Sequence, residues 1–263
     1  MKTILQMQQF KDEQKKITMV TCYDYWSARI LSQSDVDCLL VGDSVSMVVH
    51  GFDSTVHATV DMMATHTAAV ARAKTDKLII ADLPFLSHRK GTDYLMDNVD
   101  QLMKPGAGAV KIETAPGQED MAGFIADSGV PVIGHVGLTP QFVHQFGGYK
   151  VQGKSEEAQD KILKQSLELQ KKGCSALVLE CVPTRLGKMI TEELRIPTIG
   201  IGAGPYTNGQ VLVLQDLLGF NSDFKPRFVR QFAQGQNWMD QAMKDFTSSV
   251  EDQSFPKPEE SFQ

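Results

Sequence analysis

Eight short apolar segments, rich in β-branched residues, recur along the chain, and most are separated by enough residues for a helix. Each is too short for a core helix and lacks strict polar alternation, which is typical of parallel strands covered on both faces. Glycine, proline and aspartate lie between the segments and the longer stretches that separate them. The eight segments are 17–22, 37–42, 77–82, 109–113, 131–136, 175–180, 197–202 and 210–215.

The intervening stretches have the apolar spacing of helices. The clearest is 155–172, because Ser155 can cap it, acidic residues fill its first turn and lysines its last. We expect helices at 24–33, 59–74, 92–104, 117–127, 155–172 and 184–194, with two more after residue 220. Alternating strands and helices predict an α/β fold with a parallel sheet, and eight strands are the number that closes a (β/α)8, or TIM, barrel.

One barrel domain over residues 1–249 fits a chain of 263 residues, because α/β barrels reach this length undivided. Strand segment 210–215 follows 197–202 too closely for a full helix, so we expect that unit to be irregular. Residues 250–263 are polar and contain prolines, which predicts a disordered tail.

Charge and composition exclude several classes of partner. The net charge is −6 and no basic stripe is present, so we expect no nucleic-acid partner. The first residues lack the apolar run of a signal peptide and no 18 apolar residues are consecutive, so we expect a cytoplasmic protein without a membrane partner. The four cysteines include no C-x-x-C pair, and we expect buried thiols rather than zinc or disulfides.

Polar side chains stand where five of the predicted strands end. Because the chemistry of a TIM barrel gathers at the carboxyl ends of its strands, we expect these side chains to meet at one mouth. Four are carboxylates, which would repel one another unless a cation lies among them, and hard oxygen ligands favour Mg²⁺ over Zn²⁺. The residues are Asp43, Ser44, Asp82, Lys111, Glu113, His135 and Glu180.

Most of these residues also have a purely structural interpretation. Asp43 and Asp82 could cap the helices that follow, and His135 could be an ordinary core histidine. Glu113 could simply pair with Lys111 on the same strand face. Glu180 is harder to explain in this way, because a carboxylate beside apolar neighbours tends to have a raised pKa, which suits a general base.

Two further features of the sequence are weaker indications of a binding site. The glycines of GIGAG at 200–204 could bind phosphate, but their spacing is not that of G-x-G-x-x-G, and glycines also serve tight turns. His50, His57 and His66 have no metal-site spacing, and we expect them in a loop and on a helix surface, with His50 and His57 as possible substrate-loop contacts.

The sequence resembles the ketopantoate hydroxymethyltransferases from about residue 3 to about residue 245. The resemblance implies a TIM barrel that binds Mg²⁺ through Asp43, Asp82 and Glu113. The blocks that carry it, in order, are VTCYDYWSARI, LLVGDSVSMVVHGFDST, IIADLPF, AVKIE, PVIGHVGLTPQ, GCSALVLECVP, IPTIGIGAGPYTNGQVLVLQDLLGF and FKPRFVRQF.

The resemblance also implies how the substrates bind. Ser44, Asp82 and Lys111 would hold a 2-oxo acid, with Asp43 and His135 beside it. Glu180 would be the proton acceptor, and 5,10-methylenetetrahydrofolate would be the co-substrate that supplies the one-carbon unit. Members form homo-oligomers, often decamers. Asn208 and Gln215 depart from the family pattern, in which many members have an acidic residue and a histidine, and both lie outside the catalytic set.

Other activities suit the same residues. Lys111 could be the Schiff-base nucleophile of a metal-free aldolase. A Mg²⁺-dependent lyase of the isocitrate lyase or phosphoenolpyruvate mutase kind shares the barrel and the acidic cluster, but the sequence lacks the K-K-C-G-H loop of those enzymes. A barrel that only binds or scaffolds is a further alternative, although it would gain nothing from gathered carboxylates.

Overall fold

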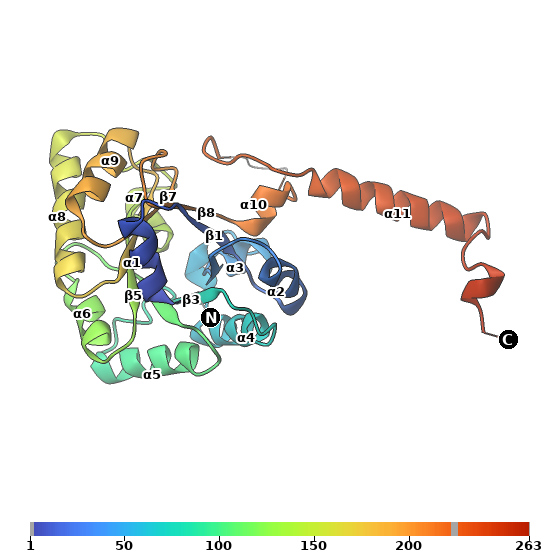
Figure 1. Ribbon diagram of the computed structural model, residues 1–263, viewed down its shortest axis with the longest axis horizontal. Helices are drawn as coiled ribbons and strands as arrows, with labels where there is room; N and C mark the ends of the chain where they lie inside the picture. Colours follow the sequence, from blue (N-terminus) through green and yellow to red (C-terminus); the bar gives the residue numbers. More distant parts are fainter. Residues whose placement is uncertain (1–2, 222–225, 263) are drawn as a thin grey trace. The chain divides into compact units, whose positions relative to one another are not determined.

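The computed structural model describes residues 3–221 and 226–262, which form two compact units, Met1–Val213 and Leu214–Gln263. The first unit is a closed barrel of eight parallel strands, each paired with its neighbours in sequence, and β8 pairs with β1. This confirms the TIM barrel (Figure 1). The strands are β1 Ile17–Thr21, β2 Cys38–Val41, β3 Leu78–Asp82, β4 Ala109–Glu113, β5 Val132–Gly137, β6 Ala176–Glu180, β7 Thr198–Ile201 and β8 Gly209–Leu212.

The six helices predicted between strands are all present. Asp24, Thr59 and Ser155 accept hydrogen bonds at the first turns of α2, α4 and α8, as N-caps do. The helices of the first unit are α1 Ile4–Asp12, α2 Tyr25–Ser32, α3 Val45–Val48, α4 Val60–Ala71, α5 Thr92–Met103, α6 Asp120–Asp127, α7 Val143–Phe146, α8 Glu156–Lys171 and α9 Thr184–Glu193, with 3₁₀ turns η1 Thr55–His57 and η2 Pro140–Phe142.

The end of the chain differs from the prediction. No helix separates β7 from β8, as expected, but β8 stops at Leu212 and the rest of its apolar run begins α10, Leu214–Leu218. After residue 220, the described residues contain one α-helix, α11 Gly235–Glu251, and the 3₁₀ turn η3 Pro258–Glu260, rather than two helices. Residues 222–225 lie outside the described residues. The boundary at 249 and the disordered tail stay predictions.

The barrel interior is filled by alternate residues of all eight strands. This cluster includes Ile17 of β1, Leu78 and Ile80 of β3, and Ala109 of β4, as the two-residue period of a strand requires. The opposite faces of the same strands pack on the surrounding helices, so the strands are buried on both sides and read as continuous apolar runs.

Helix α1, which the sequence analysis missed, covers the amino-terminal end of the barrel. Met7 belongs to the interior cluster, and Ile4 and Phe10 pack against it. The ammonium of Lys11 donates to the carbonyl oxygens of Leu194 and Ile196, at 2.8 and 3.0 Å, just before β7 begins. In the part of the chain that the structure describes, no helix combines the length and the hydrophobicity needed to cross a membrane.

Candidate active site

Strand alternation places the predicted polar residues inside the barrel, above the apolar layers. On β3, Leu78 and Ile80 face the core and Asp82 comes next on the same face; on β4, Ala109 is followed by Lys111 in the same way. The register of β3 and β4 pairs Asp82 with Lys111, and the register of β4 and β5 pairs Glu113 with His135. Side chains predicted from strand endings therefore gather at one mouth of the barrel.

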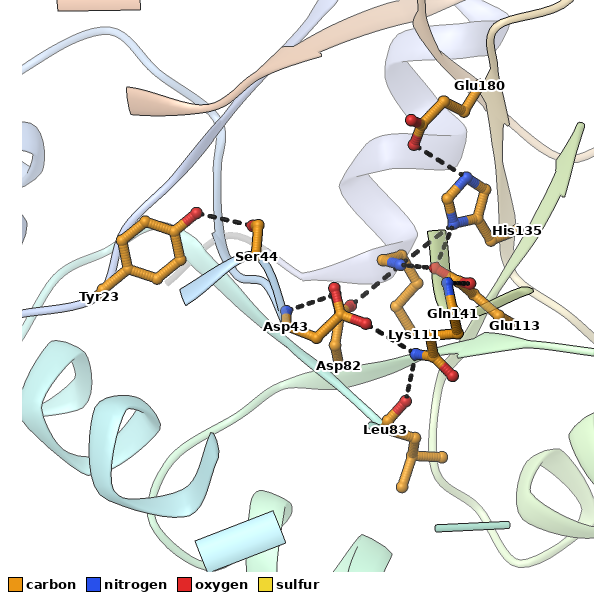
Figure 2. Close-up of polar contacts among 10 residues, drawn as sticks. All are labelled: Tyr23, Asp43, Ser44, Asp82, Leu83, Lys111, Glu113, His135, Gln141 and Glu180. Atoms are coloured by element: carbon orange, nitrogen blue, oxygen red, sulfur yellow. Dashed lines mark hydrogen bonds and ion pairs between the residues drawn. The ribbon is translucent and has the colours of Figure 1, made fainter. Parts of the chain in front are cut away.

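Lys111 lies at the centre of this group. Its ammonium nitrogen is 3.3 Å from Asp82 Oδ1, 3.5 Å from Glu113 Oε1 and 3.2 Å from His135 Nδ1 (Figure 2). All four residues are buried. Lys111 does pair with Glu113, as the structural interpretation expected, but it also binds residues from two neighbouring strands.

His135 links this centre to the predicted base. Its Nδ1 is 3.1 Å from Glu113 Oε1, and its Nε2 is 3.3 Å from Glu180 Oε2, at ion-pair distance but without hydrogen-bond alignment. The side chain of Glu180 is 16% exposed, whereas that of His135 is 3% exposed. Glu180 is thus the most accessible of the side chains in this chain of contacts, and a substrate entering the mouth would reach it.

Asp43 and Ser44 join the group from the loop after β2. The backbone N–H of Asp43 donates to Asp82 Oδ2 at 3.0 Å. The helix-cap interpretation is wrong for Asp82, because Gly91 is at the N-cap of the next helix, and Ser44 rather than Asp43 is at the N-cap of α3. The Ser44 hydroxyl is 2.8 Å from the hydroxyl of Tyr23, a buried residue that the sequence analysis did not single out.

Gln141, in the turn η2, is the main residue that the sequence analysis missed. Its side-chain amide donates to Asp43 Oδ2 at 2.8 Å and to the Leu83 carbonyl at 3.0 Å, and its backbone N–H donates to Glu113 Oε2 at 3.0 Å. It therefore connects two of the carboxylates (Figure 2). The one available signal was its place in the block GHVGLTPQ, soon after the strand that carries His135.

Burial dominates the electrostatics of the carboxylates. Burial, together with the nearby Glu113 charge, raises the pKa of Asp43 to about 6. Burial raises the pKa of Asp82 to about 8, although Lys111 opposes the shift. Burial likewise raises the pKa values of Glu113 and Glu180. The Lys111 charge lowers the pKa of each of these four acids, but it does not outweigh the effect of burial.

The pKa values of Lys111 and His135 are shifted in opposite directions. Burial alone would lower the pKa of Lys111, but the charges of Asp82, Glu113 and Asp43 outweigh it and hold that pKa above its ordinary value. Burial, assisted by the Lys111 charge, lowers the pKa of His135 to about 4. At neutral pH the site therefore contains a lysine ammonium and an uncharged imidazole.

The donor set suits a hard divalent cation. Asp43, Asp82 and Glu113 offer carboxylate oxygens, and the buried Asp82 Oδ1 accepts no hydrogen bond and has the Lys111 ammonium at 3.3 Å. Among the described residues, however, no three His, Cys, Asp or Glu side chains are already arranged to hold a metal ion. Gln141 occupies Oδ2 of Asp43 and Oε2 of Glu113, and Oε1 of Glu113 is shared by Lys111 and His135. Oδ1 of Asp43 has none of these contacts, which makes it a candidate ligand.

The weaker sequence signals fall outside this site. Gly202 and Gly204 have φ values of +65° and +83°, and a Cβ on Gly204 would lie 2.6 Å from Thr184, so these glycines serve a tight backbone turn. His50 and His66 contact each other, with 3.0 Å between their Nε2 atoms. All four cysteines are among the described residues and form no disulfide; three are buried and Cys181 is partly exposed.

Comparisons with known proteins identify the family of the chain. The family model of ketopantoate hydroxymethyltransferase matches residues 1–258. A protein of Bdellovibrio bacteriovorus named 3-methyl-2-oxobutanoate hydroxymethyltransferase is 52% identical over 262 residues, covering 100% of both chains. One of the same name from Coxiella burnetii is 50% identical over 250 residues, 95% of this chain and 94% of that protein.

The solved structures that resemble the chain are more distant. A crystal structure of 2,3-dimethylmalate lyase, a member of the PEP mutase/isocitrate lyase superfamily, has a TM-score of 0.61 at 15% identity, covering 100% of this chain and 93% of that one. That likeness shows the barrel fold alone. The family model and the two full-length relatives show more: the chain belongs to the ketopantoate hydroxymethyltransferase family and is an enzyme of that family.

Proposed function

We propose that the enzyme transfers a hydroxymethyl group from 5,10-methylenetetrahydrofolate to 3-methyl-2-oxobutanoate. The product would be 2-dehydropantoate (ketopantoate), a precursor of pantothenate and coenzyme A. The acceptor is the 2-oxo acid in the names of the full-length relatives. The observation that supports this chemistry best is the set of three buried carboxylates at the barrel mouth, gathered with a single lysine and with the partly exposed Glu180.

Mg²⁺ is the metal that these oxygen donors favour, and we assign Asp43, Asp82 and Glu113 to hold it. When bound, it would supply Lewis-acid polarisation of the substrate carbonyl. A 2-oxo acid presents its keto and carboxylate oxygens side by side, and the net negative charge of the cluster would not accept that anion without an added cation.

Glu180 is the proposed general base. Its raised pKa makes the carboxylate more basic than an exposed one, and its partial exposure lets it reach the C3 hydrogen of the substrate. An imidazole that accepts a hydrogen bond from Lys111 at Nδ1 carries its proton on Nε2, facing Glu180. We assign His135 to orienting Glu180 in this way.

Lys111 is proposed to stabilise the enolate oxygen, as a fixed ammonium beside the site where negative charge develops. Ser44 and Asp82 would position the acid next to it. The raised pKa of Lys111 opposes the aldolase alternative, because a Schiff base requires an uncharged amine. In the transfer itself, C3 loses its proton to Glu180 and forms a bond to the methylene carbon as one of the two bonds from that carbon to the folate nitrogens breaks. Water then displaces the second nitrogen and supplies the hydroxyl oxygen, and the two nitrogens take up the proton from Glu180 and one proton from the water.

Exchange of the C3 hydrogen of 3-methyl-2-oxobutanoate in D2O, without folate, tests the first step alone. We expect exchange with Mg²⁺ present and almost none after treatment with EDTA. Exchange that is unaffected by EDTA, together with a borohydride-trapped adduct on Lys111, would replace this mechanism with the Schiff-base alternative.

The metal ligands are tested by Asp82→Asn. Removing one carboxylate charge is expected to raise the Mg²⁺ concentration needed for half-maximal activity by about tenfold or more, as the loss of one charged ligand predicts. Asp61→Asn, an exposed substitution on α4, is the matched control. An unchanged Mg²⁺ titration curve for Asp82→Asn would remove Asp82 from the ligand set.

A further inference from the structure

A cavity of about 340 Å³ lies beside the carboxylate network. Its walls come from the loops after β3 and β4 and from η2 and α7 after β5, so it opens at the same end of the barrel as the site. Its volume is in the range of small-molecule pockets. The lining residues that matter here are Phe85, Leu86, His88, Arg89, Gln141 and Phe142.

Two polar side chains in this wall are buried and incompletely paired. His88 is 4% exposed and its Nδ1 has no hydrogen-bond partner; Gln141 is 2% exposed and its Oε1 has none. Buried polar atoms without partners are costly and uncommon in folded proteins. Both residues line the cavity, so their side chains are among the polar groups nearest to a ligand bound there.

The rest of the wall suits a flat ring with an anionic extension. Phe85 and Phe142 are partly buried and present aromatic surface, whereas Arg89 is exposed and carries the positive charge of the wall. Leu86 is 47% exposed and has a φ of +60°, a conformation that a leucine rarely adopts. Strained backbone of this kind clusters at active sites and ligand-binding loops.

We propose that this cavity binds the tetrahydropterin ring of the one-carbon donor, an inference that rests on the function proposed above. Gln141 and His88 bind the hydrogen-bonding edge of the ring, Phe85 and Phe142 pack beside it, and Arg89 faces the glutamate carboxylates. Gln141 lines the cavity and also donates to Asp43 at 2.8 Å, so the cavity borders the 2-oxo acid site at this residue. The methylene carbon would thus be close to the C3 nucleophile.

Binding measurements test this directly. Under anaerobic conditions, titration calorimetry with tetrahydrofolate should show a Kd about tenfold weaker for Phe142→Ala, because a lost aromatic contact of this size corresponds to about 1.4 kcal/mol. Ala115→Leu, which narrows the cavity, should weaken binding by a similar factor. Arg89→Ala should weaken binding of tetrahydrofolate severalfold, less so in high salt, but leave binding of 6-methyltetrahydropterin unchanged, because that compound lacks the glutamate.

Phe124→Ala, an exposed aromatic on α6 away from the cavity, is the control and should bind as the wild type does. Folate-free C3 exchange in Phe142→Ala separates the two proposals. If Phe142→Ala exchanges the C3 hydrogen normally but binds tetrahydrofolate more weakly, both the proposed function and the cavity assignment are supported. Equal tetrahydrofolate affinity in wild type, Phe142→Ala and Ala115→Leu would overturn the cavity assignment while leaving the exchange chemistry standing. Wild-type protein that does not bind tetrahydrofolate, even with the 2-oxo acid present, would overturn the assignment and the proposed donor together.

Discussion

Two neighbouring residues at the barrel mouth need different charge states. Lys111 must remain charged to hold Asp82 and Glu113, whereas His135, 3.2 Å away, must remain neutral beside that charge. Gln141, which has no charge of its own, satisfies one oxygen on each of two carboxylates. Neutral donors of this kind let acids approach one another without adding a competing cation.

Glu180→Gln tests the base. The amide keeps the size of the side chain but does not accept a proton, so we expect kcat to fall about 10²- to 10⁴-fold with the fold unchanged by circular dichroism. Glu168→Gln, a substitution of the same type on the surface of α8, should have wild-type turnover. Wild-type turnover in Glu180→Gln would assign the base to another group.

The stability of the metal-free protein should depend on pH through Asp82. Its pKa rises from 3.8 to about 8 on folding, because burial favours the uncharged acid. The folded state therefore holds a proton that the unfolded state releases, so the stabilisation is complete below about pH 4 and is lost as the pH rises towards 8. In EDTA, the Tm of the wild type minus that of Asp82→Asn should fall between pH 5 and pH 8. A difference that stays constant or rises would mean that Asp82 ionises normally.

Elements differ in how far the sequence predicts them. The eight strands and six of the helices were predictable because strand burial, N-caps and helical spacing are local properties. Helix α1 was missed, although Ile4, Met7 and Phe10 recur every third residue, because glutamines and lysines surround them and the surface they cover is formed by distant strands. Gln141 was missed for a related reason: its partner Asp43 is 98 residues away in sequence.

Met7→Ala measures the contribution of α1. Met7 is 2% exposed in the interior cluster, so its truncation leaves a cavity and should destabilise the protein by about 2–5 kcal/mol. Leu5 lies on the same helix and is 77% exposed, so Leu5→Ala should change stability by less than about 0.5 kcal/mol. Urea unfolding of the two variants provides the comparison. Equal destabilisation would show that α1 does not pack as described.

At the scale of the whole molecule, exposed apolar side chains predict self-association. In the first unit, Trp26 and Ile30 of α2 are 64% and 62% exposed; in the second, α11 exposes Trp238 (70%) and Phe246 (54%). Apolar surface of this kind marks interfaces. We expect a homo-oligomer, with a decamer as the form that the family resemblance implies.

Light scattering coupled to gel filtration measures the assembly against the chain mass of 29.0 kDa. Trp26→Glu combined with Ile30→Lys should lower the measured mass, because it places charges in the apolar face. Leu167→Glu, at a partly exposed position on α8, should not. A monomeric wild-type protein at micromolar concentration would contradict the prediction.

The placement of α1 across the amino-terminal end of the barrel has a kinetic consequence. With that end covered, substrates and products have to pass the same rim, and the 2-oxo acid must go deeper than the donor to reach Lys111. A donor bound in the cavity that opens at this rim would obstruct later entry of the acid. We therefore expect compulsory-order kinetics. The 2-oxo acid would bind first, and tetrahydrofolate would leave before the hydroxymethylated product.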